Sequence, residues 1–167
     1  MKSLVIYFSR AFENYAVGNI DKGNTEVIAE KIAKLTNAKL FKCDPVVEYS
    51  HKYSKCCDEA KNYQNINARP LLKEYFDDIS EYDVIYIGGP VYWSEYPYEI
   101  YSELDRLDFT GKVIKPFTTH EGSGLGDCVN VLKKKCKNAT IKNGLAIKGT
   151  DVSRPETIEK LKKWINE

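Results

Sequence analysis

SLVIYFSR (residues 3–10) and GNTEVIAEKI (residues 23–32) frame the stretch of sequence that decides the fold. The first six residues of the first segment are mostly apolar strand formers, so they predict a buried β-strand. In the second segment apolar residues recur at helical spacing, at Ile28, Ile32 and then Leu35, so this segment predicts a helix. A strand, a polar loop and a helix in this order predict a βα unit at the start of the chain.

The loop between this strand and this helix carries hydrogen-bond donors suited to an anion. Ser9, Asn24 and Thr25 provide hydroxyl and amide groups, and Gly23 allows close approach of the backbone. The N–H groups of the first helical turn point outward at the positive end of the helix dipole. The loop therefore predicts a phosphate site. A plain helix cap at Asn24 or Thr25 is an open alternative, since the P-loop and Gly-x-Gly-x-x-Gly motifs are both absent.

A second loop follows a predicted strand at residues 83–88. Gly89-Pro90 interrupts the strand, and Val91-Tyr92-Trp93 comes next, ahead of a helix that Pro97 opens. Aromatic side chains at the end of a strand offer flat apolar surfaces on which a planar ligand could stack. The open alternative is that they plug the space between the loop and the helix.

A third loop follows the predicted strand at residues 112–119. It contains His120, Gly122, Ser123 and Gly124, whose glycines let the backbone approach a ligand closely. A loop that is merely flexible is the alternative reading. All three loops follow strands in a β-α alternation, and the carboxyl ends of parallel strands lie at one edge of the sheet.

Together the three loops resemble those of flavodoxins, in particular a bacterial flavodoxin-like branch with a long first loop. Five segments carry the resemblance in this order: Tyr7-Phe8-Ser9-Arg10 with Glu13-Asn14-Tyr15, Gly23-Asn24-Thr25-Glu26, Ala68-Arg69-Pro70, Gly89-Pro90-Val91-Tyr92-Trp93 and Thr118-Thr119-His120-Glu121-Gly122-Ser123-Gly124. The resemblance implies one flavodoxin-like domain over residues 1–167. It implies an α/β three-layer sandwich around a five-stranded parallel sheet of order 2-1-3-4-5.

The resemblance also implies FMN as the cofactor, held by all three loops. The implied binding residues are Ser9, Arg10, Gly23, Asn24, Thr25, Pro90, Val91, Tyr92, Trp93, Thr119, His120, Gly122, Ser123 and Gly124. Glu95 and Glu121 are expected to place negative potential near the flavin ring, or else to be simply exposed to solvent. Which of the two aromatic residues stacks on the flavin is left open.

The remaining elements complete the predicted fold. Further strands are expected near residues 39–43 and 140–147, and each strand is expected to be followed by a helix. The segment 45–79 is interpreted as an extended crossover, with a short helix within 51–64 and a second amphipathic turn at Leu71, Leu72, Tyr75 and Phe76. Ser153 and Glu156 have the spacing of a capping box at the start of the last helix.

Composition excludes several other functions. A net charge of +1 gives no indication of nucleic-acid binding, and no apolar run is long enough to span a membrane. Five cysteines, an odd number, without a Cys-x-x-Cys motif and with only two histidines, argue against a zinc site. Reduced thiols and the lack of a signal peptide predict a cytoplasmic protein.

Two functions fit these observations. The first is an FMN-binding electron carrier that docks on redox partner proteins. The alternative is an FMN-dependent NAD(P)H oxidoreductase that reduces a quinone or a similar small acceptor, with His120 as its candidate proton donor. A receiver domain of similar fold is set aside, because Ser9-Arg10 and Gly88-Gly89-Pro90 stand where its acidic residues are required.

Overall fold

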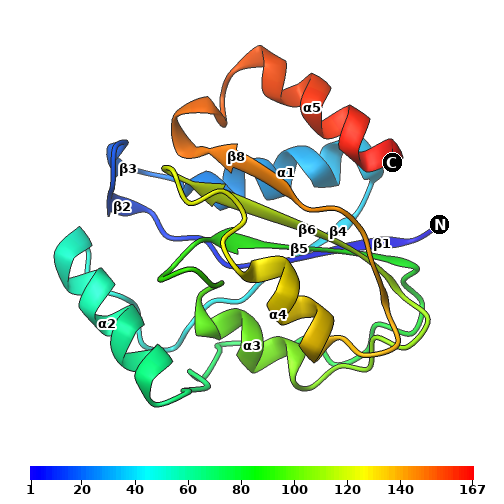
Figure 1. Ribbon diagram of the computed structural model, residues 1–167, viewed down its shortest axis with the longest axis horizontal. Helices are drawn as coiled ribbons and strands as arrows, with labels where there is room; N and C mark the ends of the chain where they lie inside the picture. The colour runs from blue at the N-terminus through cyan, green and yellow to red at the C-terminus, as the bar shows by residue number, and fades with distance from the viewer.

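The computed structural model describes all residues from Met1 to Glu167 and contains a parallel sheet with helices on both faces (Figure 1). The strands of this sheet are β1 (Ser3–Tyr7), β4 (Lys39–Lys42), β5 (Val84–Pro90), β6 (Val113–His120), β7 (Thr140–Ile141) and β8 (Leu145–Lys148). They are hydrogen-bonded in the order β4-β1-β5-β6-β7, with β8 also paired to β6. With β7 and β8 taken as one interrupted strand, this is the order 2-1-3-4-5, which confirms the predicted fold class.

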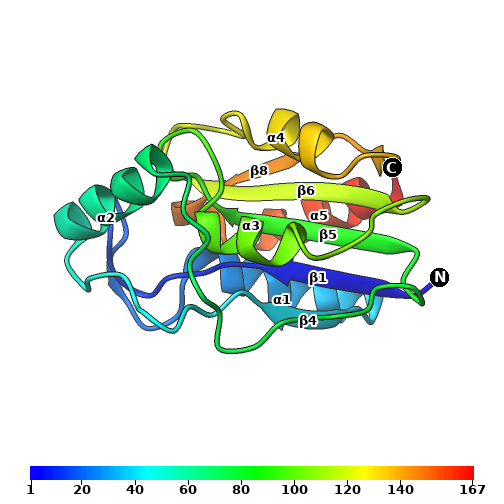
Figure 2. The ribbon, with the colours of Figure 1, turned by 90° about the horizontal axis from the view of Figure 1, so that it is seen from below.

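Alternate residues of the central strands face opposite layers, as expected for a sheet buried on both faces. Leu4 and Ile6 belong to one core, and Val5 and Tyr7 belong to the other. The helices divide in the same way, as Figure 2 shows from below. The first core is covered by α3 (Tyr98–Leu104) and α4 (Cys128–Lys135), and the second by α1 (Asn24–Thr36) and α5 (Pro155–Asn166).

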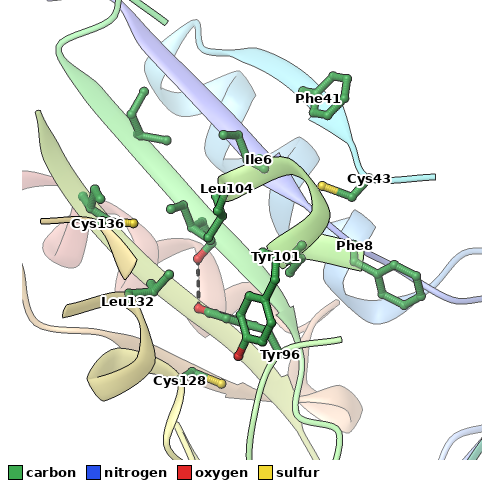
Figure 3. Packing of buried hydrophobic residues seen from close by; sticks show 14 of the residues in the cluster. Ile6, Phe8, Phe41, Cys43, Tyr96, Tyr101, Leu104, Cys128, Leu132 and Cys136 are labelled. Atoms are coloured by element: carbon green, nitrogen blue, oxygen red, sulfur yellow. Dashed lines mark hydrogen bonds between the residues drawn. The ribbon is translucent and has the colours of Figure 1, made fainter. Parts of the chain in front are cut away.

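Tyr96 fastens the loop after β5 to the centre of the sheet (Figure 3). Its hydroxyl lies 3.0 Å from the carbonyl oxygen of Ile87 and 2.9 Å from that of Phe117. The buried tyrosine thus ties the loop after β5 to both central strands, β5 and β6, and it fixes the position of the residues that precede it.

The fifth strand, predicted over 140–147, is interrupted at Lys142-Asn143-Gly144. A Cβ on Gly144 would lie 2.8 Å from Cδ2 of Leu125. The break therefore lets the backbone pass close under the loop that leads into α4. After it, β8 resumes pairing with the carboxyl half of β6.

The crossover from β4 to β5 contains α2 (Tyr53–Asn65), in agreement with the helix predicted within 51–64. The predicted amphipathic turn at 71–76 is wrong, because this segment forms no helical turn. Leu72 forms an isolated bridge with Pro45, and the ring of Phe76 packs against Phe41 at 5.6 Å between centroids. The apolar residues of this segment therefore cover the edge of β4 without forming a helix.

The long first loop contains a hairpin that the sequence did not indicate. Its strands are β2 (Phe12–Asn14) and β3 (Gly18–Ile20), paired antiparallel. The hairpin lies near α2, beyond the carboxyl ends of the sheet strands (Figure 1). The Glu13 carboxylate accepts a hydrogen bond of 2.9 Å from the Tyr53 N–H at the start of α2.

The last helix begins at Pro155, with Arg154 at the N-cap position and no side-chain cap. The predicted capping box at Ser153 and Glu156 is therefore wrong, since Ser153 stands one residue before the cap. Proline at the first helical position starts the helix without it. None of the helices is both long and apolar enough to cross a lipid bilayer.

Candidate functional site

A cavity of ≈ 510 Å³ opens at the carboxyl ends of β1, β5 and β6, where the strand order of the sheet reverses. It is lined by Ser9, Arg10, Asn14, Tyr15, Asn24, Thr25, Tyr53, Cys56, Cys57, Ala60, Pro90, Val91, Tyr92, Trp93, Ser94, Thr119, His120, Glu121 and Ser123. All predicted binding residues line the cavity except Gly23, Gly122 and Gly124. The structure thus brings the three predicted loops together around one space.

The N-terminus of α1 forms one end of this site. Ser9 Oγ accepts a hydrogen bond of 3.0 Å from the Glu26 N–H, whereas the N–H groups of Asn24 and Thr25 have no acceptor in the protein. The Thr25 hydroxyl lies 2.7 Å from that of Thr119, which comes from β6. Two free N–H groups, two buried hydroxyls and the positive end of a helix make a donor set suited to a phosphate.

Gly23 supports this donor set without lining the cavity. Its φ of −61° is open to any residue, so its backbone conformation does not require glycine. The lack of space around it does require glycine, because a Cβ at this position would lie 2.1 Å from Ser9 Oγ and 2.7 Å from the Arg10 carbonyl oxygen. The start of α1 can therefore rest directly on the end of β1 only because residue 23 has no side chain.

Residues 92–95 form a tight turn beside the cavity. Tyr92 and Glu95 exchange backbone hydrogen bonds of 2.7 and 3.2 Å, and the two residues between them, Trp93 and Ser94, have φ of 49° and 73°. Left-handed backbone at two successive non-glycine residues costs about 1–2 kcal/mol each. The turn is therefore strained and must be held by its surroundings.

Two neighbouring segments hold this turn. The Trp93 Nε1–H donates to the Cys57 carbonyl at 2.9 Å, and Gln64 Nε2 donates to the Trp93 carbonyl at 3.0 Å. On the other side the Asp127 N–H donates to the Ser94 carbonyl at 2.6 Å. The turn is thus clamped between α2 and the loop before α4, which makes its position a property of the folded protein as a whole.

The two aromatic residues of this turn have different environments. Tyr92 packs edge-on against Phe8 and Tyr49, with ring centroids 6.0 and 5.7 Å away, so part of its ring belongs to the core. Trp93 is 50% exposed at the rim of the cavity. The alternative that these aromatic residues fill space between the loop and the helix therefore applies to part of the Tyr92 ring, while Trp93 offers the more accessible aromatic surface.

We expect Ser94→Gly to raise the free energy of unfolding by about 0.5–1 kcal/mol. Glycine adopts φ of 73° without strain, and the gain exceeds the greater entropy of glycine in the unfolded chain. Denaturant unfolding of the cofactor-free protein measures the difference. Ser54→Gly, an exposed helical position, is the matched control and should destabilise by a similar amount. A loss of stability in Ser94→Gly would show that the turn is not strained.

The third loop contributes His120 and Glu121 to the cavity wall. His120 Nδ1 accepts a hydrogen bond of 2.9 Å from the Gly122 N–H, and burial lowers the His120 pKa, so the imidazole is neutral at pH 7. Burial also raises the Glu121 pKa. Gly122 and Gly124 shape this loop without facing the cavity, and the Gly124 carbonyl accepts a hydrogen bond of 2.8 Å from the Thr118 hydroxyl.

Glu95 does not take the place predicted for it. Its carboxylate accepts hydrogen bonds from the hydroxyls of Tyr98 and Tyr101 at 3.2 and 3.0 Å, and it does not line the cavity. The structure thus places this carboxylate outside the cavity lining, and its contribution to the potential at a bound flavin stays a prediction. Its neighbours turn it toward α3, where it helps to hold the strained turn.

A second wall of the cavity was missed by sequence reasoning. It consists of Asn14 and Tyr15 from the hairpin and of Tyr53, Cys56, Cys57 and Ala60 from α2. The only signal for it was the Glu13-Asn14-Tyr15 segment in the long first loop. The α2 residues carry no motif, and only the tertiary structure places them opposite the strand ends.

Comparisons with known proteins agree with this geometry. The family model described as Flavodoxin matches residues 2–167. A flavoprotein structure from Bacteroides eggerthii is 25% identical, with a TM-score of 0.78 over 99% of this chain and 96% of that one. A flavoprotein from Bacteroides uniformis is 25% identical, with a TM-score of 0.75 over 99% and 98%.

A flavoprotein from Lactobacillus acidophilus, solved in complex with FMN, is 21% identical, with a TM-score of 0.69 over 98% of each chain. No curated protein matches the sequence significantly. The donor set at the start of α1, the strand order and the family match over residues 2–167 lead to one conclusion. The chain belongs to the flavodoxin family, whose cofactor is FMN.

Proposed function

We propose that this protein is an FMN-binding electron carrier that passes electrons between redox partner proteins. The observation that carries the proposal is the donor set at the N-terminus of α1, because it fits the phosphate of FMN and opens into a cavity with aromatic walls. Asn24, Thr25 and Ser9 would hold the phosphate, and Tyr92 or Trp93 would contact the ring. When bound, FMN supplies the redox chemistry, and the protein supplies position and electrostatics.

The rim of the cavity supports a protein partner. Tyr15 and Trp93 are 60% and 50% exposed at its edge. Exposed tyrosine and tryptophan are the residues that most often dominate protein–protein contacts. With a net charge of +1, the protein has no strong overall field, so aromatic contacts rather than charge steering would bring a partner to the cofactor.

A second candidate function is an FMN-dependent NAD(P)H oxidoreductase acting on a quinone or similar acceptor. The wall formed by α2 and the hairpin favours it, because this wall gives the cavity a second side on which a small molecule could bind next to FMN. Both functions suit a reducing, cytoplasmic setting, since all five cysteines are free thiols.

Absorption spectroscopy after gel filtration tests the cofactor assignment. The purified protein, mixed with FMN, should retain flavin bands in the protein peak, and a colourless peak would overturn the proposal. Oxidation of NADH or NADPH with a quinone then separates the two functions. Turnover by the protein alone favours the enzyme, whereas reduction only in the presence of a reductase favours the carrier.

We expect Thr25→Ala to weaken FMN binding about tenfold or more and to leave riboflavin binding nearly unchanged. The variant loses a charge-assisted hydrogen bond to the phosphate, worth about 1.5–3 kcal/mol, and riboflavin has no phosphate. Fluorescence titration of both flavins provides the ratio of affinities. Equal affinity of the unmodified protein for FMN and riboflavin would contradict the placement of the phosphate at α1.

A further inference from the structure

Arg10 is the only lysine or arginine among the residues that line the cavity. It follows the end of β1 and is 8% exposed. None of the ion pairs of the protein includes it. A buried cation without a carboxylate partner is uncommon, because its desolvation is normally offset by an opposite charge.

Neutral oxygens hold the guanidinium in place. Nε and Nη2 donate to the Ser50 carbonyl at 3.2 and 2.6 Å, and Nη1 donates to the Glu13 carbonyl at 2.6 Å and to Asn14 Oδ1 at 3.4 Å. These contacts use four of the five N–H groups and leave one on Nη2 without an acceptor in the protein. The side chain is thus fixed by dipoles, and its positive charge is not neutralised.

The field of Arg10 reaches the aromatic side of the cavity. Burial raises the pKa of the Cys56 thiol to about 11, and the charge of Arg10 is the largest influence that opposes this rise. Burial likewise raises the pKa of Tyr92, and Arg10 again acts in the opposite direction. Both side chains line the cavity, so a ligand that contacts Tyr92 lies within the influence of this cation.

Glu121 is the only carboxylate among the residues that line the cavity. His120 is neutral at pH 7, and Glu95 is directed toward the tyrosines of α3. Glu121 lies on the side of α1, where its Oε1 would be only 2.0 Å from a Cβ on Gly149 and is otherwise without a hydrogen-bond partner. Burial raises its pKa, and the charge of Lys148 opposes this rise.

We propose that Arg10 raises the reduction potential of the bound FMN, because its positive charge favours the reduced, anionic form of the flavin. The inference rests on the proposed function, since it requires FMN in this cavity. Two electrons from the protein's redox donor and one proton from solvent convert neutral oxidised isoalloxazine into a ring with one negative charge. Opposite charge in a buried wall stabilises the charged form over the neutral one.

The test is the two-electron midpoint potential of the FMN-loaded protein, measured by equilibration with a redox dye and dithionite. Arg10→Gln should reduce the preference for reduced over oxidised FMN at least tenfold, which corresponds to a potential lower by about 30 mV. Arg10→Lys keeps the charge and should restore most of the potential. Lys55→Gln, on the exposed face of α2, removes the same charge away from the cavity and should leave the potential unchanged.

Asn14→Asp is an independent variant in case Arg10→Gln does not fold. It keeps the size of the side chain and places a carboxylate on the guanidinium, and it gives up the hydrogen bonds that Asn14 Nδ2 donates to the carbonyls of Arg10, Ala11 and Phe12. The added negative charge should lower the potential in the same direction. A merely structural role for Arg10 would weaken both redox states of FMN equally and leave the potential constant. That result, in variants that bind FMN, would overturn this inference alone, whereas failure of the unmodified protein to bind FMN would overturn the proposed function.

Discussion

Glu99→Gln is expected to stabilise the protein at pH 8 by about 3 kcal/mol and to have little effect at pH 5. Glu99 is fully buried on α3, where Oε2 accepts a hydrogen bond of 3.0 Å from the Tyr49 hydroxyl and Oε1 has no partner. Burial raises its pKa from 4.5 to about 7. The folded protein therefore holds a proton that the unfolded chain has already released between these two pH values.

The sign of the effect follows from this difference in bound protons. Because the folded state binds more protons, stability falls as the pH rises from about 4.5 to about 7, and the loss is complete above that range. Glutamine cannot ionise, so the variant escapes the loss. Burial also raises the pKa of Glu103 to about 7, so Glu103 adds a similar decline in stability over this pH range. The Glu99→Gln variant keeps this second decline.

Urea unfolding between pH 5 and pH 8 measures this difference. Glu159→Gln, at an exposed position of α5, is the control and should follow the unmodified protein throughout. Parallel pH profiles for Glu99→Gln and the unmodified protein would show that Glu99 remains ionised without penalty in the folded state.

Gly23→Ala is expected to weaken FMN binding at least a hundredfold, or by about 2.7 kcal/mol. The new Cβ would lie 2.1 Å from Ser9 Oγ and 2.7 Å from the Arg10 carbonyl, so α1 or the end of β1 must move. Either movement separates the free N–H groups of Asn24 and Thr25 from the hydroxyls that complete the donor set. Titration with FMN and with riboflavin shows whether the loss concerns the phosphate.

Gly89→Ala is the matched control for this prediction. Gly89 also lies at the end of a sheet strand, but the nearest atom to its Cβ would be Ile100 Cδ1 at 2.9 Å, on a side chain that can adjust. Both variants should lose some stability, and only Gly23→Ala should change the ratio of FMN to riboflavin affinity. An unchanged ratio in Gly23→Ala would mean that the phosphate is held elsewhere.

Sequence periodicity predicted the sheet because its central strands β1 and β5 are apolar on both faces and the covering helices repeat their apolar residues at helical spacing. These are local properties, so Ile6 indicated a buried strand and Leu132 a helix without tertiary information. The hairpin could not be predicted in this way. Its strands have three residues each, and although Gly18 closes the turn with φ of 69°, Phe12 and Ala16 adopt φ of 68° and 64° that their residue types do not signal.

The candidate site was predicted where a motif determines local structure and missed where distant segments meet. Ser9, Asn24 and Thr25 follow one strand and open one helix, so their convergence follows from a single βα unit. No motif indicated that Glu95 would turn to the hydroxyls of Tyr98 and Tyr101, although these stand only three and six residues further along the chain. The α2 wall depends in the same way on contacts that no local pattern encodes.

The hairpin of the first loop has a consequence for the order in which the protein assembles. Two strands of three residues are not stable alone in water, and this pair is secured by the Arg10 contact to Ser50, forty residues further along the chain. The mouth of the cavity can therefore form only after the segment before α2 has docked. By the same reasoning it should be among the first parts to open, with the fastest backbone hydrogen exchange near the cavity. The rate at which the cofactor enters and leaves should then be governed by residues 11–22, independently of how stable the sheet beneath them is.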